Sequence, residues 1–175
     1  LPVEKINEFL ESIHQLATNT YELLEELLMW SRTQQGRTEY DPVLVCFCDI
    51  ISDVFKVFEE RAKQKEIRLI DNCKETKLFA DTNMIKTILR NLIGNAIKFT
   101  REGGCIEVGA ELIDDKWAKI YVKDTGVGMS PEKISKLFEL GEKISTHGTR
   151  GEGGSGLGLL LCKEFVKIHG GKIWV

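Results

Sequence analysis

Apolar residues recur over positions 3–35 at alternating steps of three and four, which places them along one face of a long helix. The series runs through Ile6, Phe9, Ile13, Leu16, Thr20, Leu23, Leu27 and Trp30, and it is widened by Leu10, Ala17, Leu24 and Leu28. A period of about 3.5 residues is typical of a helix packed in a bundle, because a lone helix has nothing to cover such a face. We therefore expect a partner helix.

The pattern changes between residues 35 and 43, where Gly36 suits a helix cap and Pro42 cannot continue a helix. Helical and strand patterns then alternate. The helical ones cover 49–66, 82–99, a short stretch after Pro131 and 157–170, and the strand ones cover 67–70, 78–81, 105–113, 117–124 and 172–175. Asp114 and Asp115 separate two strand patterns and predict a hairpin.

These elements predict two domains. Residues 1–38 form the long helix, and residues 39–175 form an α+β domain, a two-layer sandwich with helices gathered on one face of a largely antiparallel sheet. With 175 residues and a hydrophobic content of 42%, the chain is long enough for one well-buried core and an appended helix.

Charge and cysteine content narrow the function classes. A net charge of −3 argues against a general nucleic-acid or membrane-surface binder, because such partners favour a dense basic face. No apolar run approaches the roughly 20 residues of a membrane span, and no leader peptide is recognisable. An odd number of cysteines favours a reducing compartment. Cys46 and Cys48 lack further zinc ligands at finger spacing, so we expect small core and edge residues there.

Asn91, Asn95 and Lys98 are spaced four and three apart within the helical pattern of 82–99, so they share one helix face. Two readings are open. The residues can form a solvated surface, or the Asn95 carbonyl oxygen can face Mg²⁺ while Lys98 faces an anionic oxygen. Gly94 costs about 1 kcal/mol against Ala inside a helix, which indicates that something approaches the backbone closely there.

Two glycine-rich stretches follow. The stretch "DTGVGM" at 124–129 comes directly after a strand pattern, where it can turn the chain or hold a nucleotide. The stretch "GEGGSGLGL", which begins at Gly151, can be a flexible linker. It can also wrap a phosphate chain with backbone N–H groups, helped by the positive end of the helix that it opens. A linker seldom runs straight into an apolar helix, but the pattern alone leaves both readings open.

In this order the three patterns resemble the catalytic, ATP-binding domain of sensor histidine kinases, whose superfamily also contains the gyrase, Hsp90 and MutL ATPase domains. Over residues 41–175, "RNLIGNAIKFT" matches the N box, "DTGVGM" the first glycine box, "LFEL" the F box and "GSGLGL" the second glycine box. Residues 3–35 resemble the second helix of the dimerisation and phosphoacceptor hairpin of the same family. The resemblance implies a Bergerat-type ATP-binding fold.

The resemblance also implies a site for Mg-ATP. Asp124 would be a buried carboxylate that accepts a hydrogen bond from the adenine amine, while Gly126 and Gly128 would let the backbone approach the base and sugar. Asn95 would ligate Mg²⁺, and Asn91 and Lys98 would contact metal-bound or phosphate oxygens. The other implied nucleotide contacts are Lys143, Gly154, Ser155, Gly156, Leu157 and Gly158. Lys143 would lie near the γ-phosphate. The rest would lie where an ATP lid over residues 138–156 meets the following helix.

This sequence departs from the family pattern at a few positions. Gly153 stands where relatives tend to have lysine, and Arg150 is a candidate to compensate. His14 lacks the neighbouring acidic residue and proline of a phosphoacceptor box, so the accepting histidine is expected N-terminal to this chain. The chain is also expected to stop one or two strands short of the usual domain end.

The resemblance predicts the catalytic part of a two-component histidine kinase. It would be cytoplasmic, bind Mg-ATP, transfer the γ-phosphoryl group to a histidine, feed a response-regulator receiver domain and form a homodimer through its first helix. No contact with nucleic acid or membrane is expected within these residues. A non-catalytic nucleotide-binding or dimerisation module is one alternative, and an ATPase of the gyrase or MutL kind is another. Asn91 weighs against the ATPase, since those relatives place a glutamate base there and an amide cannot take a proton from water.

Overall fold

The computed structural model describes residues 2–36, 38–114, 116–139, 148–150, 152 and 156–175. The chain divides into two compact units, Leu1–Thr38 and Glu39–Val175. Among the described residues, the model contains no helix whose length and apolar character would suffice to cross a bilayer.

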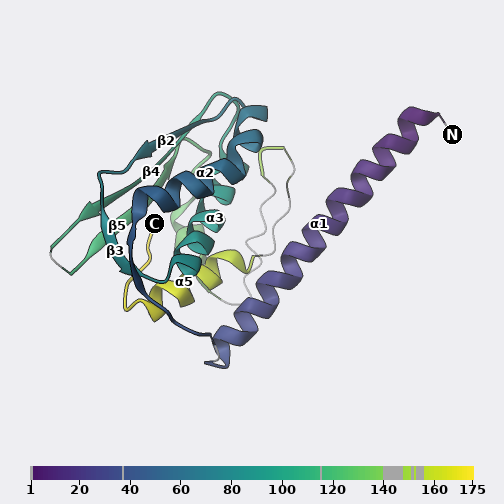
Figure 1. The fold of residues 1–175 in the computed structure, drawn as a ribbon. Helices are drawn as coiled ribbons and strands as arrows, with labels where there is room; N and C mark the ends of the chain where they lie inside the picture. Colours follow the sequence, from purple (N-terminus) through teal and green to yellow (C-terminus); the bar gives the residue numbers. More distant parts are fainter. Residues whose placement is uncertain (1, 37, 115, 140–147, 151, 153–155) are drawn as a thin grey trace. The chain divides into compact units, whose positions relative to one another are not determined.

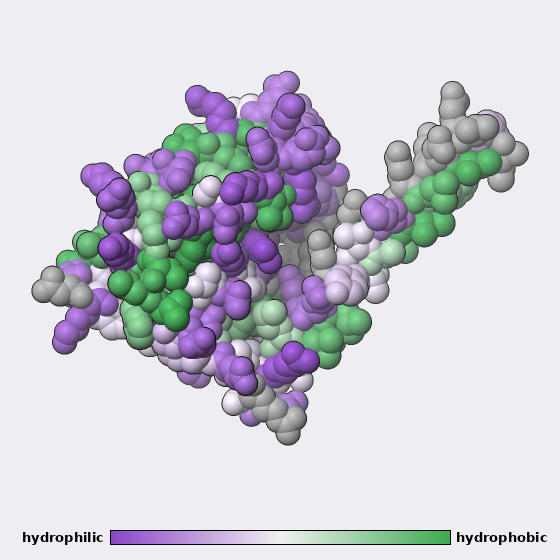
Figure 2. Space-filling view, in the orientation of Figure 1, coloured by the Kyte–Doolittle hydropathy of each residue, from purple (hydrophilic) through white to green (hydrophobic). Residues whose placement is uncertain are grey.

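The first unit consists almost entirely of α1 (Val3–Gln34), which confirms the long helix expected from the apolar pattern. The helix ends in the way the sequence predicts. Gly36 takes up a left-handed conformation with φ +64°, and its N–H donates to the Thr33 carbonyl at 3.1 Å. Much of the apolar face lies open in this unit, with Phe9, Ile13 and Leu16 exposed by 62%, 62% and 68%. Figure 2 shows apolar surface running along this helix.

The second unit alternates strands and helices. In chain order its elements are β1 (Val43–Cys46), α2 (Phe47–Gln64), β2 (Arg68–Asn72), β3 (Lys77–Ala80), α3 (Thr82–Phe99), β4 (Cys105–Leu112), β5 (Ala118–Asp124), α4 (Pro131–Lys136) and α5 (Gly158–Ile168). The helical patterns after residue 48 and the first four strand patterns are therefore confirmed.

The strands form two small sheets. One has the order β2-β4-β5, in which β2 runs parallel to β4 and β4 runs antiparallel to β5, and the other pairs β1 with β3 antiparallel. The β4–β5 pair is the hairpin predicted around Asp114 and Asp115, with Val108 opposite Val122. The helices α2, α3 and α5 lie together on one side of the strands (Figure 1), as a two-layer α+β sandwich requires.

The helix α3 is the centre of this unit, since it contacts α2, α5, β4 and β5. It begins where the Asp81 side chain accepts hydrogen bonds from the N–H groups of Asn83 and Met84. Its buried residues recur every three or four positions and face the core: Met84, Ile85, Ile88, Leu89, Ile93, Ala96 and Ile97. The opposite side of the helix, which carries the polar residues of the N-box pattern, is left partly open.

The strand predicted over residues 172–175 does not form. Trp174 and Val175 are each 63% exposed. Alternation of apolar and polar residues is only half of what a strand needs, because its backbone groups must also pair with a neighbouring strand. Within the described part of the chain, the structure pairs no strand with residues 172–175.

The expectation of small core and edge residues at Cys46 and Cys48 did not include a disulfide. Cys48, in the first turn of α2, forms a disulfide with Cys73, which follows β2, with their Cα atoms 5.6 Å apart. The two cysteines are separated by 25 positions in the sequence, a spacing that matches no framework. Cys46, Cys105 and Cys162 form no disulfide.

Candidate nucleotide site

The helix α3 presents Asn91, Asn95 and Lys98 on its partly open side, and all three residues are half-buried. The sequence prediction that they share a face is therefore met. The Asn91 amide N–H₂ group donates to the Thr87 carbonyl at 3.1 Å. This bond fixes the side chain and does not use the amide oxygen, which keeps its capacity to accept a hydrogen bond from a ligand or from metal-bound water.

Lys98 is partly withdrawn from solvent at the last turn of α3. Burial lowers the pKa of its ammonium group, and the nearby carboxylate of Glu152 opposes this shift. The ammonium also lies 4.8 Å from the centroid of the Phe99 ring. A half-buried cation beside an aromatic ring is well suited to pair with a phosphate oxygen.

The first glycine box forms the loop that leaves the sheet after β5. Asp124 ends the strand, and its Oδ1 accepts a hydrogen bond of 2.8 Å from the Gly126 N–H, as in an Asx turn. The Asp124 side chain is exposed, so the expectation of a buried carboxylate is wrong for this structure. The reason is its position at the end of β5, where the chain departs from the sheet.

Gly126 ties this loop to α3. A Cβ atom at Gly126 would stand 2.7 Å from the Phe99 carbonyl oxygen, so no larger residue fits without moving the backbone. The next residue uses the same carbonyl, because the Val127 N–H donates to Phe99 O at 3.2 Å. Gly128 has a left-handed φ of +68° that other residues rarely adopt. The loop and the carboxyl end of α3 are thus one connected piece of structure.

The second glycine box is described only in part. Lys143, Gly154 and Ser155 lie outside the described residues. So does Gly153, the position at which relatives tend to have lysine. Leu157 is the N-cap of α5 and Gly158 its first residue, and Gly156 precedes them with φ +76°. The α5 helix packs on α3. The structure therefore places α5 in the same helical layer as α3.

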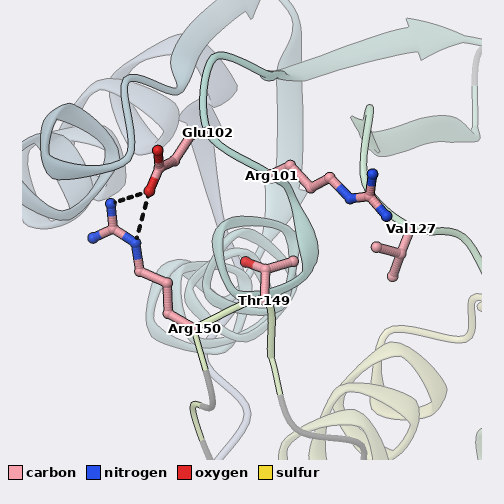
Figure 3. Close-up of a pocket in the computed structure, with 5 residues that line it drawn as sticks. All are labelled: Arg101, Glu102, Val127, Thr149 and Arg150. Carbon is pink, nitrogen blue, oxygen red and sulfur yellow. Dashed lines mark hydrogen bonds and ion pairs between the residues drawn. The ribbon is translucent and has the colours of Figure 1, made fainter.

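Sequence reasoning missed a pocket beside the first glycine box. It has a volume of about 430 Å³ and is lined by Arg101, Glu102, Val127, Thr149 and Arg150. Figure 3 shows the Arg101 side chain reaching toward Val127, and Arg150 turned toward Glu102. Of these five only Val127 belongs to a predicted box, and the side chains expected to bind nucleotide do not line the pocket. Solvent-exposed arginine residues after a helix are common, so Arg101 in the sequence did not point to a pocket.

Arg150 was suggested to compensate for Gly153, which lies outside the described residues, so this suggestion stays a prediction. The Arg150 guanidinium donates to Glu102 Oε1 at 2.6 Å and to the Gln64 carbonyl at 3.0 Å. These contacts direct the cation toward the carboxyl end of α2.

The donor set of the polar face suits a nucleotide-bound metal better than a metal held by the protein alone. Among the described residues, no group of three or more His, Cys, Asp or Glu side chains could hold an ion. Mg²⁺ commonly takes few protein ligands and completes its shell with water and substrate phosphates. One amide oxygen from Asn95 fits that mode of binding.

Comparison with known proteins agrees with this geometry. Residues 80–175 match the family described as histidine kinase-, DNA gyrase B- and HSP90-like ATPases. This chain belongs to that family. The match starts just before α3 and includes the N-box face, both glycine boxes and α5. Similar proteins place the chain more narrowly, with the catalytic ATP-binding domains of sensor histidine kinases.

One relative within the family is the hybrid signal transduction histidine kinase C of Dictyostelium discoideum, which is 33% identical over 96% of this chain. The chain spans only 14% of the length of that relative. The solved catalytic domain of the histidine kinase ThkA is 29% identical, with a TM-score of 0.65 over 77% of this chain and 86% of that domain.

Two further solved structures share the fold. Full-length ShkA in complex with AMPPNP is 24% identical and has a TM-score of 0.74 over 94% of this chain and 34% of its own. ThkA in complex with the response regulator protein TrrA is likewise 24% identical, with a TM-score of 0.66 over 98% of this chain and 46% of that chain.

Proposed function

We propose that residues 39–175 bind Mg-ATP and transfer its γ-phosphoryl group to a histidine that lies N-terminal to residue 1. The chain would be the catalytic region of a two-component histidine kinase. One observation carries this proposal: the half-buried amide and ammonium face of α3 is joined to the first glycine box by the Val127–Phe99 hydrogen bond. That arrangement brings metal-compatible oxygens, a phosphate-compatible cation and an adenine-compatible carboxylate into one connected region.

Each residue has a role in this proposal. Asp124 still has its second carboxylate oxygen to accept from the adenine amine, while Oδ1 is held by the Gly126 N–H. Gly126 and Gly128 leave the backbone open to the base and sugar. Asn95 is the metal ligand, and Asn91 and Lys98 hold metal-bound or phosphate oxygens. The remaining contacts are assigned by the family resemblance to Lys143, Gly154, Ser155, Gly156, Leu157 and Gly158, with the N-terminus of α5 toward the phosphates.

Phosphoryl transfer suits such a site, because catalysis of this reaction depends mainly on positioning and on neutralising charge. When bound, Mg²⁺ would neutralise part of the phosphate charge. The chain itself would orient the nucleotide, exclude water around the phosphates and supply the cation Lys98.

Asn91 favours transfer over hydrolysis. Its amide is fixed by the bond to Thr87 and cannot act as the general base that activates water. This observation makes the superfamily's ATPase activity the least favoured of the three functions. A non-catalytic nucleotide-binding module stays the other candidate, and only a measurement of transfer separates it from the kinase.

The partners follow from the same proposal. The phosphoryl group would pass from the histidine to a receiver domain of a response regulator, and the chain would form a homodimer through α1 and its hairpin partner. The complex of ThkA with TrrA supports a receiver partner, and the AMPPNP complex of ShkA supports the nucleotide. The need for ATP supports a cytoplasmic location.

The test is transfer from γ-labelled ATP and Mg²⁺ to this chain and to a version extended N-terminally through the expected hairpin helix. We expect acid-labile, base-stable label on the extended chain alone, and no label when Asn95 is replaced by Ala. Label on this chain would make His14 an acceptor. If neither chain takes label although nucleotide binds, the non-catalytic module is the better account.

A further inference from the structure

Lys65 is a buried cation in the second unit, with only 4% of its surface exposed. It follows α2 as the C-cap residue, and the site described above does not include it. A buried ammonium group is costly unless charged and polar partners surround it. Lys65 Nζ has four partners: the Ile97 carbonyl at 3.0 Å, the Lys98 carbonyl at 3.3 Å, the Thr149 hydroxyl at 2.8 Å and Glu152 Oε1 at 2.6 Å.

These partners gather at the carboxyl end of α3. The last four carbonyl groups of a helix lack partners within the helix; here the C-cap residue satisfies the first, and other segments satisfy the remaining three. Ala96 O accepts from Thr100 N, Ile97 O from Lys65 Nζ, Lys98 O from Thr149 N and Lys65 Nζ, and Phe99 O from Val127 N. Three separate segments therefore converge on this helix end: the end of α2, the first glycine box and the segment around Thr149.

The segment around Thr149 lies close against Lys98. The Thr149 N–H donates to the Lys98 carbonyl at 3.0 Å. A Cβ atom at Gly148 would stand 2.9 Å from the same carbonyl oxygen, so glycine is needed for this approach. Lys98 is the cation assigned above to a phosphate oxygen. Whatever holds the segment in place therefore also fixes the surroundings of that cation.

Glu152 closes the segment on itself and onto Lys65. Its Oε2 accepts from the Arg150 N–H at 2.8 Å, and its carbonyl accepts from the Gly148 N–H at 2.9 Å. Burial by itself raises the pKa of the Glu152 carboxyl, but the bond from Lys65 and the backbone donors outweigh it, so the pKa is lowered. Glu152 is thus an ionised partner for Lys65, and the pair links α2 to residues 148–150.

We propose that Lys65 is a positioning residue for nucleotide binding: with Glu152 it clamps residues 148–150 onto the carboxyl end of α3 and so fixes Lys98 and the first glycine box for the phosphates. This proposal rests on the proposed function, since it assumes that Lys98 meets a phosphate. Lys65 itself acts through the segment and through α3. The clamp explains why a lysine is buried here, which a purely apolar helix junction would not require.

The test compares Glu152→Gln with Glu75→Gln, a matched control at an exposed turn. Amide hydrogen exchange at Thr149 in the nucleotide-free chain reports the clamp directly. Affinities for Mg-ATP and for adenosine, which lacks phosphates, report its consequence. We expect Glu152→Gln to speed Thr149 exchange roughly tenfold and to weaken Mg-ATP binding roughly tenfold, because one charge-assisted hydrogen bond is lost. The affinity for adenosine should be unchanged. Glu75→Gln should alter none of these values.

Lys65→Met should speed Thr149 exchange and weaken Mg-ATP binding more than Glu152→Gln does. Its matched control is Lys63→Met, on the exposed side of α2. Because Lys65→Met removes a buried cap and can prevent folding, Glu152→Gln decides the matter by itself. Unchanged Thr149 exchange and Mg-ATP affinity in Glu152→Gln would overturn the proposal. So would an equal loss of Mg-ATP and adenosine affinity together with a lower melting temperature, since that is the mark of a merely structural pair.

Failure of the proposed function gives a different result. If the native chain binds no Mg-ATP, that function is wrong and the positioning role falls with it. Thr149 exchange in Glu152→Gln then still shows whether the clamp holds the segment.

Discussion

Gly94 lies in the middle of α3, and the sequence suggested that something approaches its backbone closely. The neighbour is the Phe58 ring of α2, whose nearest atoms would be 3.7 Å from a Cβ built at Gly94. That distance is an ordinary van der Waals contact, so an alanine fits. The glycine is therefore not evidence of a ligand at this point of the helix.

We predict that Gly94→Ala raises the free energy of unfolding by about 1 kcal/mol, because alanine has the higher helix propensity and restricts the unfolded chain. Urea unfolding of both chains measures this difference. Mg-ATP affinity should stay the same, since Gly94 faces α2. A destabilised variant would mean that Phe58 packs more tightly than the distance indicates.

Among single residues, the sequence predicted those that the spacing of one helix groups together. It missed those that only tertiary folding brings into contact. Asn91, Asn95 and Lys98 are fixed by helical spacing, so their common face followed from periodicity. Lys65 sits in the charged run "KQKE" and looks like a solvated lysine. Its burial depends on Glu152, which is far away in sequence, and only folding brings the two together.

Among the elements, α3 depends most on a single capping side chain. Asp81 is buried and accepts from the N–H groups of Asn83, Met84 and Asp41 at 3.0, 3.0 and 3.1 Å. Burial raises the pKa of its carboxyl, but these backbone donors outweigh the effect and the pKa is lowered. A lowered pKa in the folded state means that stability is present above the unfolded pKa and is lost as the pH falls through the folded one.

We predict that Asp81→Ala lowers the free energy of unfolding at pH 7 by about 1–2 kcal/mol, as expected for a lost N-cap. The gap to the native chain should narrow as the pH falls below about 4, because the unfolded chain then binds a proton at Asp81 while the native carboxyl, with its lowered pKa, is still largely ionised. Denaturant unfolding at pH 7 and pH 3 measures the gap; an equal gap at both values would contradict the prediction.

The elements also show where periodicity is sufficient and where it is not. Helices α2, α3 and α5 and the β4–β5 hairpin follow from patterns of apolar residues, because each has a buried face that the pattern records. The pattern of residues 172–175 predicts a strand equally well, but a pattern cannot show whether another strand is available to pair with it. Disulfide pairing of Cys48 and Cys73 is a matter of spatial proximity in the same way.

For the whole molecule, the exposed apolar face of α1 predicts self-association. Replacing Phe9 and Leu16 by Lys places charge on that face. We expect the native chain to sediment as a dimer and this variant as a monomer, because the burial of apolar area drives such association. Thr18→Lys, at an exposed position outside the apolar series, is the matched control and should stay dimeric. A monomeric native chain would show that α1 needs its hairpin partner to associate.

The central claim for the whole molecule is that the face of α3 and the first glycine box together hold an adenine nucleotide. Calorimetric titration with Mg-ATP and Mg-GTP tests it most directly, using the native chain, Asp124→Asn and the control Asp49→Asn on the exposed first turn of α2. We predict that the native chain and Asp49→Asn bind Mg-ATP and prefer it to Mg-GTP. Asp124→Asn should lose at least roughly tenfold in Mg-ATP affinity, because a hydrogen bond to a charged group is removed. No binding of Mg-ATP by the native chain, or equal affinity in Asp124→Asn, would contradict this account.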